Sequence, residues 1–291
     1  MDRSSGVTLT GRTRTAGVIG SPIRHSLSPV MFNAAFVASG MDWAYLAFEV
    51  PEGRATGAME ALRALGIEGV SVTMPHKAAI LPALDSISED AALLGAANCV
   101  TQRAGALHGD NTDGAGFLDA LRIDEGIEIE GQACVVVGAG GAGRAVARAL
   151  AQAGARVTIV NRSAPAAERA AVIAGHSARV GSMTDLAEAS LVVNATPLGM
   201  GLGAAPGGRP EPLPFDVTLL APGQVVFDLV YHPAPTPLMV AATAQGLRSV
   251  HGLGMLVYQA AHAFRAWTGE EPPLAAMRLA ASTALGQRRP G

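Results

Sequence analysis

Lysine is almost absent from this 291-residue chain, because Lys77 is the only lysine among 21 basic residues and the others are all arginine. Charged residues make up only 15% of the chain, and the net charge is -3. So small a charge leaves no basic surface of the kind that nucleic acids or anionic membranes require. No apolar run reaches the length of a transmembrane helix. We therefore expect neither nucleic acid nor a membrane as a partner.

Cysteine is also scarce, and its two copies, Cys99 and Cys134, have no spacing typical of a disulfide framework or a metal site. We therefore expect no metal and a reducing, cytoplasmic location. The first residues, MDRSSGVTLTGRTRTAG, lack the apolar core of a signal peptide, which predicts a short irregular tail. A monomer and a homodimer both stay open.

The composition that remains, 49% hydrophobic with 35 glycines and 18 prolines, is typical of a globular α/β protein. The chain is long enough for two domains. Between residues 16 and 110, the strand-like runs AGVIG, WAYLAFEV and GVSVT alternate with helical stretches at about 29–39 and 54–65. This alternation predicts βαβ units and a mainly parallel sheet. The segment NCVTQRAGALHGDN interrupts it and predicts a hairpin that turns at Ala104 and Gly105, added at the sheet edge.

A second α/β pattern begins near Gly131 with ACVVVGAGGAGRAVARALAQAGARVTIVNR, which predicts a strand, a glycine loop, a helix and another strand. The strand-like runs LVVNAT and VVFDLV follow, separated by a Gly/Pro-rich stretch over 197–214 that predicts a flap without regular structure. After HGLGM the chain is predicted helical, and Pro272 and Pro273 open a last helix that ends near Leu285.

The glycine loop matches the GxGxxG fingerprint of dinucleotide-binding domains. Glycines allow a tight turn and a close approach to a pyrophosphate, whose charge then faces the helix N-terminus. The loop residues are Gly138, Ala139, Gly140, Gly141, Ala142 and Gly143. NAD-binding loops usually carry an acidic residue at the end of the second strand, but this chain has Asn161, Arg162 and Ser163 there. An arginine suits a 2′-phosphate, so we expect NADP(H), with Arg162 as a solvated surface residue as the alternative.

Lys77 stands out because lysine, unlike arginine, can exchange a proton near neutral pH. The plain alternative is a leftover surface lysine. Other polar residues also follow the strands of the first half, where open α/β sheets bind ligands. They are Ser26, Ser28, Thr73, Asn98 and Asp113. Ser28 or Asp113 could instead cap a helix, and Thr73 could start a turn. Their convergence on one edge predicts a site.

Several segments resemble, in order, the motifs of shikimate dehydrogenases: GSPIRHSLSPVMFNAAF, VTMPHK, GAANCV, GDNTDGAGF, GAGGAGRA, NRS, NATPLGM, DLVYHPAPTPL and HGLGMLVYQA. The resemblance runs from about Gly17 to Ala260. It implies a substrate-binding and catalytic domain over 1–113 and 252–291 and a Rossmann-type NADP-binding domain over 114–251, with the C-terminal helices returning to the first domain.

The resemblance also implies a reaction, the reversible reduction of 3-dehydroshikimate to shikimate by hydride transfer, in the pathway to chorismate and the aromatic amino acids. By motif position, Lys77 and Asp113 would be the proton-transfer couple. A positioned ammonium can stabilise and protonate the oxygen that gains charge when a carbonyl is reduced.

The remaining roles follow from the motif positions alone. The substrate carboxylate would be held by Ser26, Ser28 and Tyr231, and the ring hydroxyls by Thr73, Asn98, Asp113 and Gln259. The cofactor cleft would be lined by Asn194, Ala195 and Thr196, with Gly252 and Met255 beside the nicotinamide. We expect His25 and His76 to brace loops and not to take part in catalysis.

One position departs from the family pattern. NADP-specific members often carry a second basic residue where this chain has Ala166, although Arg169 might substitute, so NAD use stays open. Quinate or aminoshikimate dehydrogenase activity is an alternative, as is a non-catalytic NADP-responsive binding protein. Lys77 with Asp113 favours an enzyme, since a sensor needs neither.

Overall fold

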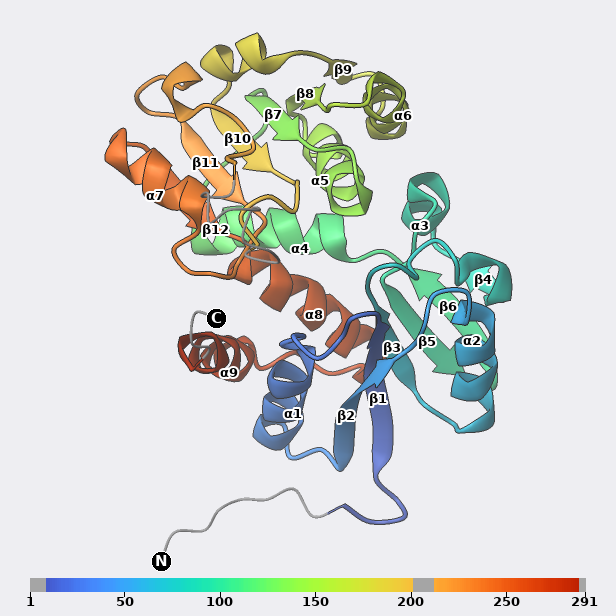
Figure 1. Cartoon of the computed structure of the whole chain (residues 1–291). Helices are drawn as coiled ribbons and strands as arrows, with labels where there is room; N and C mark the ends of the chain where they lie inside the picture. Colours follow the sequence, from blue (N-terminus) through green and yellow to red (C-terminus); the bar gives the residue numbers. More distant parts are fainter. Residues whose placement is uncertain (1–8, 201–211, 288–291) are drawn as a thin grey trace, which may run out of the picture. The chain divides into compact units, whose positions relative to one another are not determined.

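The computed structural model describes residues 9–200 and 212–287, which form two compact units (Figure 1). Unit 1 comprises the described part of Met1–Thr112 together with Ala260–Gln287, and unit 2 comprises Asp113–Gln259. Most of the flap expected over 197–214 and the first residues of the expected tail lie outside the described residues. The tail is also shorter than expected, because the first strand already begins at Arg14.

Unit 1 contains a six-stranded sheet with the order β2-β1-β3-β5-β6-β4. Its strands are β1 (Arg14–Gly20), β2 (Trp43–Glu49), β3 (Gly69–Val72), β4 (Ser86–Ile87), β5 (Cys99–Arg103) and β6 (Ala106–Asp110). Its helices are α1 (Ser28–Ala38), α2 (Ala55–Ala64), the 3-10 helix η1 (Leu81–Ala83), α3 (Glu89–Leu94) and α9 (Leu274–Gly286). The pairs β1–β2, β1–β3 and β4–β6 are parallel, as the βαβ pattern predicts.

The hairpin of unit 1 is confirmed. Strands β5 and β6 are antiparallel, and the turn between them has positive φ angles of 49° at Ala104 and 82° at Gly105. Two consecutive positive φ angles give the turn that matches the right-handed twist of a hairpin. The expectation that the hairpin forms the sheet edge is wrong, because the two-residue strand β4 pairs with the outer side of β6.

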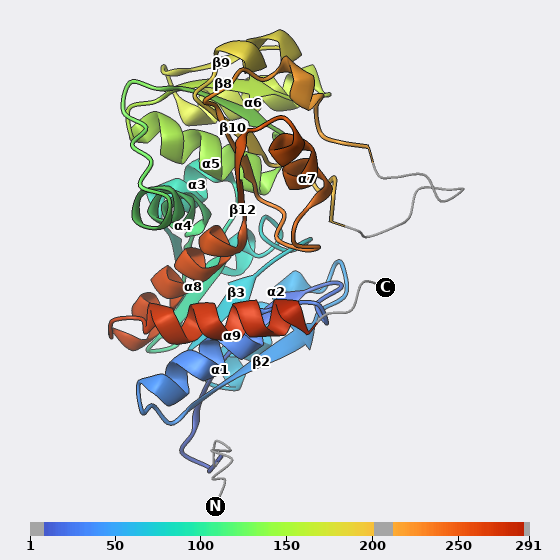
Figure 2. The same ribbon diagram turned by 90° about the vertical axis from the view of Figure 1, so that its left-hand side faces the viewer.

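The C-terminal helices return to unit 1, as expected. Helix α8 (Leu253–Thr268) ends there with Trp267, whose indole Nε1 donates to the carbonyl of Val100 at 3.1 Å. The indole lies so close to Gly69 in β3 that a Cβ there would be 2.3 Å from Nε1. Helix α9 lies alongside α1 (Figure 2). These contacts attach the last helices to the sheet.

Unit 2 contains a second six-stranded sheet, with the order β12-β11-β10-β7-β8-β9 and all strands parallel. Its strands are β7 (Ala133–Val137), β8 (Arg156–Val160), β9 (Ala178–Val180), β10 (Leu191–Asn194), β11 (Val225–Asp228) and β12 (Arg248–His251). Its helices are α4 (Asp113–Asp119), the π-helix η2 (Ala120–Asp124), α5 (Gly141–Gln152), α6 (Ala164–Ala174), the 3-10 helices η3 (Met183–Glu188) and η4 (Val217–Leu219), α7 (Pro237–Ala244) and the first part of α8. This order is that of a Rossmann-type sheet, which confirms the predicted fold class.

The units change over at Thr112/Asp113 and again within α8, at Gln259/Ala260. The domain limits expected from the sequence, 113/114 and 251/252, stay a prediction. Among the helices in the described part of the chain, none has both the length and the apolarity to cross a bilayer.

Candidate active site

The loops that follow β1, β2 and β3 are joined to one another at the carboxyl edge of the unit 1 sheet. The amide of Ser21, directly after β1, donates to the carbonyl of Met74, after β3, at 3.0 Å. The imidazole Nε2 of His76 bonds the carbonyl of Val50 at 2.7 Å. His76 is buried, with 1% of its surface exposed. It therefore braces the loop that carries Lys77, as expected, whereas His25 is exposed.

The two serines after β1 are in direct contact. The hydroxyl of Ser26 accepts from the backbone N–H of Ser28 at 3.2 Å, at the start of α1. Ser28 is the first residue of that helix and is not its N-cap, which is Leu27. The alternative that Ser28 only caps the helix is therefore wrong, since Ser26 satisfies the N-terminal N–H group.

Ser28 lies beside a buried tyrosine that sequence reasoning missed. The Tyr45 hydroxyl donates to Ser71 Oγ at 2.8 Å and is also hydrogen-bonded to Ser28. Burial raises the pKa of Tyr45 far above its usual value, so the phenol stays protonated and holds the two serines in place. The strand pattern around Tyr45 identifies it as a core residue but does not reveal its partners.

Lys77 is half-buried, and its backbone carbonyl accepts from the amide of Ala97 at 2.9 Å. This bond places the lysine next to Asn98, which has 4% of its surface exposed. The Asn98 side-chain Oδ1 in turn accepts from the amide of Thr112 at 2.8 Å. The structure therefore brings Lys77 and Asn98 together within unit 1.

Asp113 begins α4 in unit 2 and has 6% of its surface exposed. It is the first residue of that helix and lies in its first turn. Gly116, one turn later, packs so closely on α8 that a Cβ there would be 2.5 Å from the amide nitrogen of Gln259. Residues three apart lie on the same side of a helix. Asp113 and Gln259 are therefore on facing sides of α4 and α8.

The glycine loop has the geometry that dinucleotide binding needs. Gly138 has a φ of 112°, which an L-residue rarely adopts. A Cβ on Gly143 would lie 2.1 Å from the carbonyl oxygen of Gly138. Gly140 and Gly141, in contrast, have no atom within 4 Å of their ideal Cβ positions. The outer two glycines therefore serve packing, while the middle of the loop leaves open space at the N-terminus of α5, the place at which dinucleotide-binding domains hold a pyrophosphate.

Asn161 connects the glycine loop to the end of β8. Its Oδ1 accepts from the amide of Ala139 at 3.2 Å, and its Nδ2 donates to the carbonyl of Ser163 at 3.0 Å. Arg162 lies between these two contacts and is exposed. One side chain thus links the glycine loop to the segment that carries Arg162.

Arg144, directly after the last loop glycine, is a second basic residue at this place. Its Nη1 contacts the carbonyl of Ala139 at 3.4 Å. Partial burial, with a smaller contribution from Arg169, lowers the pKa of Arg144. Arg169 is therefore near enough to act on Arg144 electrostatically. Sequence reasoning missed Arg144, although a basic residue directly after the fingerprint was the available signal.

Asn194, at the end of β10, is fully buried and belongs to a polar cluster with the half-buried Thr196 and the fully buried Asp228. Its Oδ1 accepts from the amide and hydroxyl of Thr196, at 3.0 and 2.7 Å, and its Nδ2 donates to Asp228 at 2.8 Å. Ala195 packs against the glycine loop, 2.8 Å from the Cβ position of Gly138. The three residues expected to line the cofactor cleft therefore adjoin the loop. Sequence reasoning missed Asp228, because its partners are distant in the sequence.

The residues expected near the nicotinamide lie at the end of β12. The amide of Gly252 donates to the carbonyl of Val230 at 3.2 Å. A Cβ on Gly252 would lie 2.0 Å from the carbonyl oxygen of Leu229, so only glycine fits. Tyr231 is the next residue after Val230, and Met255 is buried in α8. No group of three or more His, Cys, Asp or Glu side chains in the described ranges could hold a metal.

Comparison with known proteins agrees with this arrangement. Residues 18–100 match the family model described as the shikimate dehydrogenase substrate binding domain, and residues 252–281 match the shikimate 5'-dehydrogenase C-terminal domain. Residues 126–198 match a model described as putative NAD(P)-binding.

Individual relatives match over nearly the whole chain. A shikimate dehydrogenase (NADP(+)) from Citrifermentans bemidjiense is 44% identical, over 96% of this chain and 98% of its own. A crystal structure of a shikimate dehydrogenase with NADP+ superposes with a TM-score of 0.88 at 36% identity, covering 97% of this chain and 99% of that one. The enzyme from Thermus thermophilus, in complex with NADP(H) and shikimate, gives a TM-score of 0.85 at 39% identity, covering 94% and 100%.

Proposed function

The chain belongs to the shikimate dehydrogenase family, and from that premise we propose that it interconverts 3-dehydroshikimate and shikimate with NADP(H). It is an oxidoreductase that acts on a CH–OH group. The observation that carries the residue assignments is the tethering of the only lysine beside buried Asn98, at the carboxyl edge of the unit 1 sheet.

The glycine loop and the residues around it would hold NADP(H). The open space over Gly140 and Gly141 fits a pyrophosphate at the N-terminus of α5, a helix of 12 residues. Arg162, with Arg144 and Arg169 close by, offers positive charge for a 2′-phosphate. When bound, this cofactor supplies or accepts the hydride at the nicotinamide C4. Gly252 and Met255 are the residues proposed to lie beside that ring.

The substrate carboxylate would be held by neutral groups. Ser26 and Ser28 already touch, and Ser28 is anchored by the buried Tyr45 hydroxyl. We assign them to the carboxylate together with Tyr231. The remaining side chains, which would bond the ring hydroxyls, are Thr73, Asn98, Asp113 and Gln259. Hydroxyl and amide donors that are fixed in advance lose little conformational entropy on binding.

Lys77 and Asp113 would carry the proton. In the reductive direction, negative charge develops on the substrate oxygen, and the Lys77 ammonium hydrogen-bonds that oxygen and then gives it a proton. The Asp113 carboxylate would hold the ammonium and the neighbouring substrate hydroxyl in position. In the oxidative direction, neutral Lys77 takes the hydroxyl proton back. A sensor protein would need neither residue.

Steady-state kinetics with shikimate and NADP+ test this assignment. Lys77→Met removes the exchangeable proton, and Lys77→Arg keeps a positive charge that does not give up its proton at neutral pH. We expect both variants to lower kcat by about 10²–10⁴-fold, the range for general acid–base catalysis, with a smaller change in KM.

The exposed Arg54→Ala provides a matched control with one positive charge removed, and it should retain wild-type rates. An unchanged kcat in Lys77→Met would refute the proton-transfer role. If Lys77→Arg were fully active while Lys77→Met were not, charge alone would suffice and the proton-donor role would be wrong.

We also propose a cytoplasmic location. Burial raises the pKa of both thiols, Cys99 and Cys134, to about 12, and both are free cysteines. Unpaired structural thiols are typical of a reducing compartment. The expectation of a monomer or homodimer stays a prediction.

A further inference from the structure

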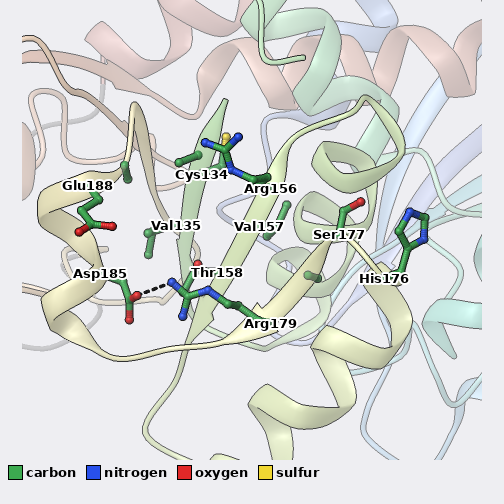
Figure 3. A pocket seen from close by; sticks show the side chains of 13 residues that line it. Cys134, Val135, Arg156, Val157, Thr158, His176, Ser177, Arg179, Asp185 and Glu188 are labelled. Carbon is green, nitrogen blue, oxygen red and sulfur yellow. Dashed lines mark hydrogen bonds and ion pairs between the residues drawn. The ribbon is translucent and has the colours of Figure 1, made fainter. Parts of the chain in front are cut away.

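Unit 2 carries a pocket of about 380 Å³ that none of the roles above uses (Figure 3). It lies at the amino ends of β7 and β8, where Val135, Arg156 and Thr158 contribute to its lining. The carboxyl end of β7 leads into Gly138 and the glycine loop. The pocket is therefore at the opposite end of the strand from the proposed cofactor site.

A short 3-10 helix connects β9 to β10 beside the pocket. This helix, η3, spans only Met183–Glu188 and places Leu186 in the apolar core of unit 2. Asp185 and Glu188, on the same helix, line the pocket. A longer helix would cover more of the sheet at this place.

The pocket wall presents one cation and one anion that do not neutralise each other. Arg179 and Asp185 form an ion pair (Figure 3). Arg156 and Glu188 are exposed, and neither has an ion pair or side-chain hydrogen bond with any described residue. Both charges are therefore available to a molecule in the pocket.

Thr158 adds a buried polar group. Only 7% of its surface is exposed, and it lines the pocket beside Val135. Among the described residues, Gln102 Oε1 is the enclosed side-chain polar atom without a partner, so the Thr158 hydroxyl is not sealed off and is open to solvent. It can therefore bond a molecule in the pocket.

We propose that this pocket binds a small zwitterion that carries a carboxylate and an ammonium group, which is the chemistry of an α-amino acid. Arg156 can bond the carboxylate through two N–H groups, and Thr158 can donate to the same group. Glu188 pairs with the ammonium, and the apolar surface at Val135 accepts the side chain. A ligand of one sign only would leave Arg156 or Glu188 uncompensated. This site is independent of the proposed dehydrogenase activity.

Thermal unfolding of the full chain tests the proposal, with each of the common α-amino acids added in turn. At a concentration about ten times Kd, a specific ligand should raise Tm by about 2–4 °C. The best amino acid is then compared with its decarboxylated amine and its deaminated acid. We expect neither of these to raise Tm, because each lacks one of the two charges.

Variants locate the binding. Glu188→Gln and Thr158→Val keep the shape of the side chain, and Arg156→Gln replaces the cation with a shorter neutral polar group. Each should weaken binding about ten-fold or more, measured by titration calorimetry. Arg54→Gln and Glu52→Gln, which remove exposed charges in unit 1, should bind like wild type. Amide NMR shifts at Thr158 and Ser177 on addition of the ligand provide a readout in the folded variants.

Three results would overturn the proposal: no amino acid raises Tm, the deaminated acid binds as tightly as the amino acid, or the three pocket variants bind like wild type. The second result would identify a simple anion site and the third a site elsewhere. Because every readout is binding, failure of the dehydrogenase assay would leave this test unaffected.

Discussion

Asp228 at the end of β11 is a carboxylate without exposed surface, and removing it should destabilise unit 2 by a predictable amount. Its Oδ1 accepts from Asn194 Nδ2 at 2.8 Å and from the amide of Val230 at 3.1 Å, and its Oδ2 accepts from Thr236 Oγ1 at 2.7 Å. Asp228→Ala leaves these three buried donors without an acceptor. Each buried donor without an acceptor lowers the free energy of unfolding by about 1–3 kcal/mol. The variant no longer has to bury a charged carboxylate, and this gain offsets part of the loss. We expect a loss of about 3–5 kcal/mol.

Asp228→Asn is the matched control. Its amide oxygen can keep the bonds from Asn194 and Val230, and its NH₂ group can donate to the Thr236 hydroxyl. The same hydroxyl accepts from the amide of Met239 at 3.2 Å and has a second lone pair that can accept this bond. Because the shape is kept and no charge has to be buried, we expect a change of about 1 kcal/mol or less.

Urea denaturation followed by far-UV circular dichroism measures both variants. With two units in one chain, the transition that moves in Asp228→Ala is the one that belongs to unit 2. If Asp228→Ala stayed within about 1 kcal/mol of wild type, the buried cluster would not stabilise the unit as described. If Asp228→Asn lost as much as Asp228→Ala, the negative charge and not the acceptor geometry would be essential.

The same carboxylate predicts a pH dependence. Burial raises the pKa of Asp228 above its ordinary value of 3.8, although the bonds from Thr236, Val230 and Asn194 oppose this shift. A raised native pKa means that the folded state holds the proton more tightly than the unfolded state. The contribution to stability is therefore complete below pH 3.8 and is lost as pH rises through the native pKa. The difference in unfolding free energy between wild type and Asp228→Asn should fall over that interval, and a difference that is flat or rises would contradict the shift.

Three further substitutions follow from the geometry. Arg162→Ala should raise KM for NADP+ about 10–100-fold and leave KM for NAD+ nearly unchanged, and equal effects on both would exclude a 2′-phosphate contact. Gly143→Ala should weaken cofactor binding and cost about 1–3 kcal/mol, because its Cβ would lie 2.1 Å from a carbonyl oxygen; wild-type binding by calorimetry would refute this. Gly69→Ala should lower the free energy of unfolding, measured by urea denaturation, by about 3 kcal/mol because the new Cβ displaces Trp267. The control Gly57→Ala, in open space on α2, should be neutral or stabilising by up to about 1 kcal/mol. Equal changes in the two variants would contradict the contact between Gly69 and Trp267.

The sequence predicted the elements that have a strong pattern. The run ACVVVGAGG, in which a continuous apolar stretch precedes the glycines, predicted strand β7 and helix α5. The residues Ala104 and Gly105 predicted the turn of the hairpin. The strands β4 and β9, which have only two and three residues, are too short to show any periodicity. They are defined by pairing with strands distant in the sequence, which local patterns do not encode.

Polar residues of the site were easier to find than the residues that position them. Ser28 was recognised because it follows a strand at the edge where open α/β sheets bind ligands, and Lys77 because it is the only lysine of the chain. Tyr45 and Asp228 were not, because their importance depends on partners 26 and 34 positions away. A tyrosine inside a strand and an aspartate at the end of one are both common without such partners.

In both units, side-chain amides of asparagine fix the loops next to the strand ends. Three asparagines lie next to strand ends: Asn98 precedes β5, Asn161 follows β8, and Asn194 ends β10. The side-chain oxygen of each accepts a hydrogen bond from the backbone N–H of another loop residue. A side-chain amide can fix a loop in this way while the neighbouring residue stays available, as Arg162 does beside Asn161. Because both partners of each bond belong to the protein, these bonds restrict the loops, and a restricted loop loses less entropy on binding. Loss of such an amide should therefore weaken binding, seen in KM, more than it slows a bound substrate.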